Sequence, residues 1–374
     1  MTSAPHTSVL PEQAVHPGRF VIDELEELGW SSEKLAEMTH RSHASLLRVL
    51  RGRAPITKPL ATDFESALGL SAKLLIRLQK SYQETLARLA SKPEMQADVD
   101  LLQRQTIPWR EFAKRGWIRD LGTDIERVSE LRSMYDVDAL VDVESGRHRA
   151  AFRITQNTRY DSWALAAWLQ QGEWQVLEAQ WESETEVSPR FNSALLSESL
   201  DEMRRLTVEP DFWQRLRSYC AKAGVHLELV PHVRKSGANG VTRWMDDGRP
   251  LIQLSLYRGW ADVFWFTFFH EAAHVLREHR RNVYINLDRV PREDDAEREA
   301  DDFARDFLIP PEHWLPYWDK VRCSRANIEY LADDVGVHPG IVVGRLQHEK
   351  RIPYSAHNDL RSKLEYDLLG AEAS

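Results

Sequence analysis

Two histidines and a glutamate lie within a strongly apolar helical segment of this chain. The segment 260–278 contains the sequence HEAAH at residues 270–274, an H-E-x-x-H pattern. Because one helical turn separates His270 from His274, both imidazoles project from one helix face and can bind the same metal ion. Glu271 lies beside them, where it can accept a proton from a metal-bound water. The pattern predicts a zinc site that lacks only its third protein ligand.

The residues around this sequence argue against a solvated helix face. The flanking positions are apolar on most sides: Val263, Phe264, Trp265, Phe266, Phe268, Phe269, Val275 and Leu276. Polar groups in such a buried helix need partners, and metal coordination supplies them. The alternative is a pair of core histidines satisfied by ordinary hydrogen bonds. Metal binding is the favoured interpretation.

A second predicted helix supplies candidates for the third ligand. Residues 294–308 have core-facing apolar spacing and are followed by two prolines that end the helix. Glu297 and Asp301 stand at i and i+4. Glu297 can therefore complete the three ligands, while Asp301 accepts a hydrogen bond from a liganding histidine. Glu299 is the rival ligand, and Glu297 is preferred because only Glu297 has Asp301 one turn later. Alternatively, the acids of the first turn are a solvated group favoured by the helix dipole.

Residues 266–274 (FTFFHEAAH) and 297–310 (EREADDFARDFLIP) together resemble the ImmA/IrrE-type metallopeptidases. The resemblance extends from about Leu227 to the C-terminus and shows no departure at the ligand positions. It implies a compact zinc peptidase, and characterised members of that family cleave repressor proteins. The residue that stabilises the oxyanion stays open among four candidates: Tyr257, His232, His279 and Tyr284.

A hairpin is predicted ahead of the metal-binding helix. Residues 240–244 and 250–256 have strand character, and Asp-Asp-Gly at 246–248 supplies the turn. In zinc peptidases such a strand commonly pairs with an extended substrate by β-augmentation. We therefore expect the substrate to lie along residues 250–256.

The N-terminal region carries a second, independent signal. Residues 20–30 have helical periodicity, and Ser31 or Ser32 can cap the next helix. Ser42 can cap a further helix that ends at Gly52, which gives a helix-turn-helix outline. Between residues 38 and 62 there are five bases and no acid: Arg41, Arg48, Arg51, Arg53 and Lys58. In a chain of net charge −9 this local positive patch is typical of a DNA reader. The alternative is a small helical bundle with a solvated basic face.

Residues 16–18 (HPG) and 52–57 (GRAPIT) resemble the HigA-type antitoxin branch of helix-turn-helix proteins, over roughly residues 16–90. The turn departs from that pattern, because His40 and Arg41 stand where a glycine and a small apolar residue are usual. His40 would then adopt a left-handed backbone conformation. By this resemblance the first part of the recognition helix faces base edges, through His43, Ala44, Ser45 and Arg48. The bases that follow hold phosphates: Arg51, Arg53 and Lys58.

Length and composition fit several domains, since the chain has 374 residues. We expect a mainly helical α+β protein with a helix-turn-helix bundle at 1–92, a mixed α/β connecting region at 93–205 and a compact zincin-like metallopeptidase domain at 206–374. A polar stretch at 91–100 is interpreted as a linker. The two cysteines form no C-x-x-C pair, so neither a disulfide framework nor a thiolate zinc site is indicated. No apolar leader or membrane span is present, which predicts a cytoplasmic protein without membrane contact.

These observations predict a cytoplasmic DNA-binding transcriptional regulator that carries a zinc-dependent endopeptidase domain. As a homodimer it would bind a double-stranded DNA operator, and it would cleave a repressor or partner protein by Glu271-assisted attack of zinc-bound water. The alternative is a non-proteolytic, antitoxin-type autorepressor that neutralises a partner toxin and uses the zinc domain as a sensing or binding module. Glu271 favours the peptidase, because a structural zinc site needs no base. The antitoxin-type N-terminal region favours the repressor.

Overall fold

The computed structural model divides the chain into two compact units, Met1–Arg149 (unit 1) and Ala150–Ser374 (unit 2). It describes residues 14–41, 43–50, 52, 54–105, 107–119, 122–146, 148–155, 159–182, 189–277, 284–287, 295–318 and 322–366. Most of these residues are helical, and one four-stranded mixed sheet accompanies them, which confirms the predicted α+β class. The three-domain division expected at residues 92 and 205 stays a prediction.

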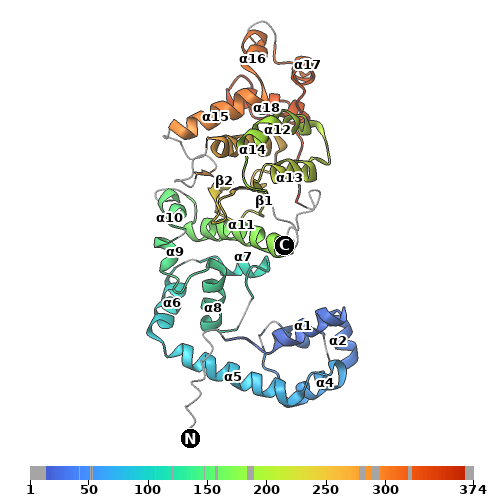
Figure 1. Ribbon diagram of the computed structural model, residues 1–374, viewed down its shortest axis with the longest axis vertical. Helices are drawn as coiled ribbons and strands as arrows, with labels where there is room; N and C mark the ends of the chain where they lie inside the picture. The colour runs from blue at the N-terminus through green and yellow to red at the C-terminus, as the bar shows by residue number, and fades with distance from the viewer. Residues whose placement is uncertain are drawn as a thin grey trace. The chain divides into compact units, whose positions relative to one another are not determined.

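Unit 1 is helical wherever the structure describes its elements (Figure 1). Its helices are α1 (Gly18–Leu28), α2 (Ser32–Thr39), α3 (His43–Leu50), α4 (Lys58–Leu68), α5 (Ala72–Ala90), α6 (Pro93–Arg104), α7 (Trp109–Lys114), α8 (Asp124–Tyr135) and α9 (Asp142–Ser145). The linker predicted at 91–100 is wrong, because only Ser91 and Lys92 separate α5 from α6. Pro93 stands at the start of α6, where its missing N–H leaves no helical hydrogen bond unmade.

A short turn joins α2 to α3. Ser31 caps α2 by accepting a hydrogen bond from the Lys34 N–H, as one of the two predicted caps. His40 has φ 54°, so it adopts the left-handed conformation expected there. The predicted cap Ser42 lies outside the described residues. These helices enclose an apolar core with α1, α4 and the start of α5, which includes Val21, Leu35, Leu46, Phe64 and Leu75.

A buried histidine fixes the start of α1. The Nδ1 atom of His16 accepts a hydrogen bond from the Gly18 N–H at 3.0 Å, and its ring packs edge-on against Tyr82. Gly18 must lack a side chain, because a Cβ there would lie 2.6 Å from the Val49 carbonyl oxygen at the end of α3. Burial, together with the positive charge of Arg119, lowers the pKa of His16 from 6.5 to about 4.

This lowered pKa predicts an acid-sensitive contribution to stability. Unfolded chain protonates His16 near pH 6.5, whereas folded chain does so only near pH 4, so the contribution is complete above pH 6.5 and lost as pH falls toward 4. Replacing His16 by Asn keeps an acceptor for the Gly18 N–H but removes the titration. Between pH 7 and pH 4.5 the wild type should lose about 1–3 kcal/mol more unfolding free energy than His16→Asn. Denaturant unfolding of the full chain at both pH values measures this difference, and equal losses would contradict the assignment.

Unit 2 combines helices with the sheet. Its helices are α10 (Arg149–Thr155, at the boundary), α11 (Ser162–Glu182), α12 (Ser193–Arg205), η1 (Leu206–Val208), α13 (Phe212–Lys222), α14 (Ala261–Leu276), α15 (Asp295–Leu308), α16 (Pro311–Trp318), α17 (Arg325–Val335), α18 (Pro339–His348) and η2 (Asn358–Leu360). Its strands are β1 (His226–Leu229), β2 (Ala238–Trp244), β3 (Pro250–Leu254) and β4 (Tyr284–Leu287). The strands expected in the connecting region 93–205 are not found among its described residues, whose elements are helices. None of the described helices has both the length and the apolarity to span a membrane.

The sheet has the strand order β1-β3-β2-β4. The predicted hairpin is present, because β2 and β3 pair antiparallel across a turn in which Gly248 has φ 81°. However, β1 pairs parallel with the other side of β3. The expectation that a substrate extends along residues 250–256 is therefore wrong, since both edges of β3 already carry protein partners. Among the strands that the structure describes, β1 and β4 are the outer ones.

Both faces of the sheet are covered by helices. In Figure 1, α14 lies on one face and α11 on the opposite face. On the α14 side, Thr242 of β2 bonds to Glu271. On the α11 side, Arg243 donates to Glu173 at 2.8 Å, and Gln253 of β3 donates to the Trp168 carbonyl at 2.6 Å. This alternation along the strands fixes which residues of β2 can reach the helix that carries the HEAAH sequence.

Candidate metal centre

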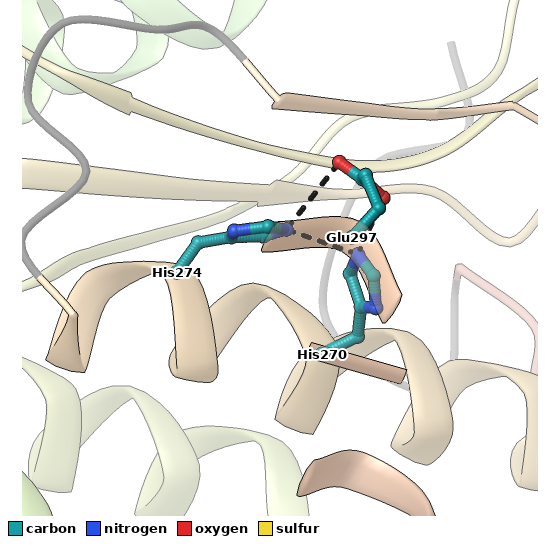
Figure 2. A group of neighbouring side chains, drawn as sticks. All are labelled: His270, His274 and Glu297. Carbon is teal, nitrogen blue, oxygen red and sulfur yellow. Dashed lines mark hydrogen bonds and ion pairs between the residues drawn. The ribbon is translucent and has the colours of Figure 1, made fainter. Parts of the chain in front are cut away.

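The helix α14 places three functional side chains in the interior. Its residues from Phe264 to Val275 are almost all buried, and the exposed fraction is 1% for His270 and 0% for both Glu271 and His274. Figure 2 shows His270 and His274 projecting from α14 toward Glu297. The imidazoles approach each other through their Nε2 atoms, which lie 3.2 Å apart. Two nitrogen donors thus point at one location.

The third group reaches this location from α15. The buried positions of α15 are Glu297, Ala300, Ala304 and Leu308, which share one face at helical spacing. Both alanines are completely buried, so their small side chains permit close packing. Glu297 continues this buried stripe at the first turn, which brings its carboxylate to the histidines. Its Oε2 lies 3.3 Å from His270 Nε2, and its Oε1 lies 3.5 Å from His274 Nε2.

These distances fit a tetrahedral metal ion. Zinc binds histidine nitrogen and carboxylate oxygen at about 2.0–2.2 Å, so its ligand atoms in a tetrahedron lie about 3.3–3.6 Å apart. The Nε2 atoms of His270 and His274 lie 3.2 Å apart, and each lies 3.3 or 3.5 Å from a different oxygen of Glu297. One ligand atom from each of the three residues lies within 4.8 Å of the other two. Two imidazoles and one carboxylate are a donor set that zinc accepts, with a fourth position left open. Within the described part of the chain, this is the one such group of potential ligands.

Two further acids of α15, Asp301 and Glu299, have different partners. Asp301 Oδ1 lies 2.9 Å from Nδ1 of His270, so the ring can donate its Nδ1–H there and keep Nε2 available as a ligand. This is the place predicted for Asp301. The rival ligand Glu299 is instead 61% exposed and pairs with Arg277 at 3.1 Å. The structure therefore brings Glu297, and not Glu299, to the histidines.

A threonine on β2 holds the carboxylate of Glu271, and the sequence analysis did not identify it. The Thr242 hydroxyl lies 2.8 Å from Glu271 Oε2 and 3.1 Å from the Glu271 carbonyl oxygen. The strand can approach α14 this closely because residue 240 is glycine. A Cβ at Gly240 would lie 2.5 Å from Thr267 Cγ2 and 2.9 Å from Glu271 Oε1. Alternation along the predicted strand could have assigned Thr242 and Gly240 to one face, but not to this helix.

The start of α14 is clamped by a segment near the C-terminus. Arg361 makes a bidentate ion pair with Asp262, at 2.8 and 2.9 Å. The Ala261 N–H donates to the Ser362 carbonyl oxygen, which satisfies one of the unpaired donors at this helix end. Burial raises the pKa of Asp262 above its ordinary value, and the Arg361 guanidinium opposes that rise. The clamp fixes the position of α14 two turns ahead of His270.

Of the four candidates for the oxyanion-stabilising residue, the structure describes the side chains of His232 and Tyr257. His232 and Tyr257 pack edge-on against each other, with ring centroids 5.5 Å apart. Tyr366 accepts a hydrogen bond from the His232 N–H, which ties this pair to the C-terminal segment. His279 lies outside the described residues, as does the side chain of Tyr284.

The predicted DNA contacts of unit 1 are described only in part. The ring of His43 lies 2.9 Å from the Ser32 hydroxyl and 3.3 Å from a Glu33 carboxylate oxygen, so it contacts α2. Lys58 is exposed at the first turn of α4. Arg41 pairs with Asp63, the first acid beyond the basic stretch. Outside the described residues lie Arg51 and Arg53, together with the side chains of Ala44, Ser45 and Arg48.

One family model matches the segment that contains the candidate metal centre. Residues 261–347 match the Peptidase M78 model, described as the IrrE N-terminal-like domain. The match begins at the first residue of α14, ends within α18 and covers less than a quarter of the chain. No curated protein and no solved structure matches the chain. The resemblance to ImmA/IrrE metallopeptidases is thus confirmed for this segment, and the HigA-type resemblance stays a prediction.

The donor geometry predicts which substitutions remove zinc. Purified chain should contain about one zinc ion, and His274→Ala or Glu297→Gln should lose it, because two donors cannot hold the ion. Glu299→Gln is the matched control and should keep the metal, since Glu299 pairs with Arg277. Asp301→Asn should weaken zinc affinity by roughly 10- to 100-fold. Elemental analysis and competition with a chelator measure these effects. Loss of zinc from Glu299→Gln but not from Glu297→Gln would contradict the ligand set.

Proposed function

We propose that unit 2 is a zinc-dependent endopeptidase that cleaves a repressor or another partner protein. The observation that carries this proposal is the fit of the three donors, His270, His274 and Glu297, to one tetrahedral ion with Glu271 adjacent. A purely structural zinc site has no use for an additional buried carboxylate beside it. The metallopeptidase-type match over the same segment supports this reaction class.

Each residue then has a separate role. Zinc held by the three donors supplies a Lewis acid that polarises a peptide carbonyl and lowers the pKa of a water molecule. Glu271 accepts the proton of the attacking water and returns it to the departing amine nitrogen. Thr242 holds the Glu271 carboxylate through Oε2 and so orients the base. Asp301 fixes the tautomer and ring orientation of His270.

We place the substrate along β4 rather than β3. The strand β4 pairs with β2 on one side and is the last strand of the sheet, whereas β3 is paired on both sides. An extended peptide adds most readily to such an outer strand, through main-chain hydrogen bonds. In the pairing of β4 with β2, Asn286 lies opposite Gly240, and Gly240 packs against Glu271. A peptide on the free edge of β4 would therefore be separated by β4 from Gly240, the residue that packs against the catalytic base.

The proposed roles predict two distinct losses of activity. Zinc-loaded Glu271→Gln should keep the metal but lose at least about 100-fold in cleavage rate, because the general base is absent. Thr242→Val preserves shape but removes the hydroxyl, and it should lower kcat on the order of 10-fold with little change in KM. The assay uses labelled casein and the proteins encoded next to this gene, with Glu299→Gln as control. Cleavage at the wild-type rate by zinc-loaded Glu271→Gln would remove Glu271 from the mechanism.

For unit 1 we propose binding to double-stranded DNA as a homodimer, which makes the chain a transcriptional regulator. Two short helices joined by a left-handed turn residue, His40, support this proposal. Lys58 is exposed and would contact a phosphate. The contact of His43 with Ser32 and Glu33 argues that this residue orients α3 on α2 rather than reading a base. Base contacts are then left to Ala44, Ser45 and Arg48.

The charge of the basic stretch gives a test of DNA binding. Lys58→Ala should weaken binding to operator and scrambled duplexes alike and lower the salt slope by roughly 0.9. Arg48→Ala should cost on the order of 1–3 kcal/mol on the operator only. Lys80→Ala is the control, because Lys80 is exposed on α5 and pairs with Glu84. Fluorescence anisotropy of the full chain across salt concentrations, with DNA from upstream of its own gene, measures both. Failure of the wild type to bind either duplex would exclude the regulator role.

A further inference from the structure

A cavity of about 750 Å³ opens beside the metal centre in unit 2. Its wall includes six apolar residues, from α14, β4, α15, α18 and the residue after α15: Val263, Phe266, Leu287, Leu308, Ile309 and Ile341. Two contacts join it directly to the centre. Asp301 lines the cavity and bonds to His270, and the Phe266 ring stacks on the His270 ring with centroids 6.4 Å apart. Any molecule that occupies the cavity therefore lies next to a proposed zinc ligand.

Two buried carboxamides also line this cavity. Asn239 on β2 is 9% exposed and Asn286 on β4 is 4% exposed. Neither side-chain amide makes a hydrogen bond to a residue that the structure describes. Each amide can offer a donor and an acceptor to a molecule in the cavity, so this arrangement favours an occupant that supplies acceptors and donors. A peptide main chain carries both.

The charges on the wall are already paired, which disfavours a charged occupant. Arg345 pairs with Glu349, Arg305 pairs with Asp306, and Arg298 pairs with Asp295. The two remaining carboxylates, Asp262 and Asp301, bond to Arg361 and His270 as described above. A charged side chain entering the cavity would have to give up water without gaining a free counter-ion. An apolar side chain would bury its surface against the six apolar residues.

We propose that this cavity is the specificity pocket of the peptidase. It receives a large apolar side chain of the substrate, aliphatic or aromatic, from a residue next to the cleaved bond. Asn239 and Asn286 hydrogen-bond the main chain of the same substrate segment. The volume lies within the range of about 300–1,000 Å³ that is usual for ligand pockets. This inference rests on the proposed zinc peptidase function and names its substrate class.

Binding of three hydroxamates to the zinc-loaded full chain tests the pocket without a known substrate. Acetohydroxamate reports on the metal centre alone, because it chelates zinc but carries no side chain. Two dipeptide hydroxamates, identical except for leucine or glycine at the residue beside the hydroxamate, report on the pocket. The leucine compound should bind about 10- to 100-fold more tightly than the glycine compound, from burial of the isobutyl group. Equal affinities for these two compounds would overturn the proposal that the cavity is a specificity pocket.

Substitutions in the cavity test whether the preference for the leucine compound arises there. Val263→Phe fills it and should reduce the preference for leucine to less than about 3-fold. Val208→Phe is the matched control, because Val208 is 55% exposed and does not line the cavity. Asn286→Leu should weaken both dipeptide compounds while acetohydroxamate binding stays unchanged, which also verifies that the variant folds. A Val263→Phe protein that discriminates as well as Val208→Phe would overturn the assignment.

The three compounds also separate the two proposals. Binding of acetohydroxamate without discrimination between leucine and glycine leaves the zinc peptidase standing and removes the specificity pocket. Failure of acetohydroxamate to bind chain that holds one zinc overturns the open metal centre, and the pocket with it. Tight leucine binding that Asn286→Leu does not weaken overturns the role of the carboxamide alone.

Discussion

Burial of four ionisable side chains in one place is the constraint on which unit 2 depends. His270, His274, Glu271 and Glu297 are each at most 8% exposed. Charged groups removed from water are costly unless they are paired or bind a metal. At mutual distances of 3.2–3.5 Å the three donors would be compensated by one shared metal ion, and Thr242 donates a hydrogen bond to the fourth group. The cluster therefore has to be assembled as a set, because removing one member leaves the others with an uncompensated desolvation cost.

This requirement explains the precision with which α14 is held. The Asp262–Arg361 pair fixes its beginning, and β2 approaches its centre only because Gly240 has no side chain. On the opposite flank, Ala300 and Ala304 let α15 pack closely enough for the Glu297 carboxylate to reach the imidazoles. A displacement of α14 relative to α15 by even one ångström would alter both separations between Glu297 and the histidines. The apolar packing around the helix is therefore part of the metal centre.

The spacing of residues within single helices predicted the candidate metal centre. Contacts between distant parts of the chain could not be predicted from that spacing. The i and i+4 relation between Glu297 and Asp301 identified both residues, because both lie on one helix face with fixed geometry. Thr242 and Arg361 act on α14 from distant parts of the chain, so no spacing within a helix could reveal them. The strand β3 was given the wrong role for the same reason, since its second edge is covered by β1. The linker at 91–100 failed because polarity alone does not prevent a helix.

Asp301 contacts both the candidate metal centre and the neighbouring cavity. One of its oxygens holds the His270 ring, while the residue as a whole lines the cavity proposed as the specificity pocket. Its side chain is 40% exposed, in contrast to the 1% of the histidine it supports. An occupant of the cavity would exclude water from this carboxylate and so strengthen its hydrogen bond to the ring, because electrostatic attraction grows as the local dielectric constant falls. A tighter bond from Asp301 raises the basicity of His270 as a ligand. Filling the cavity would therefore also affect a metal ion held by His270.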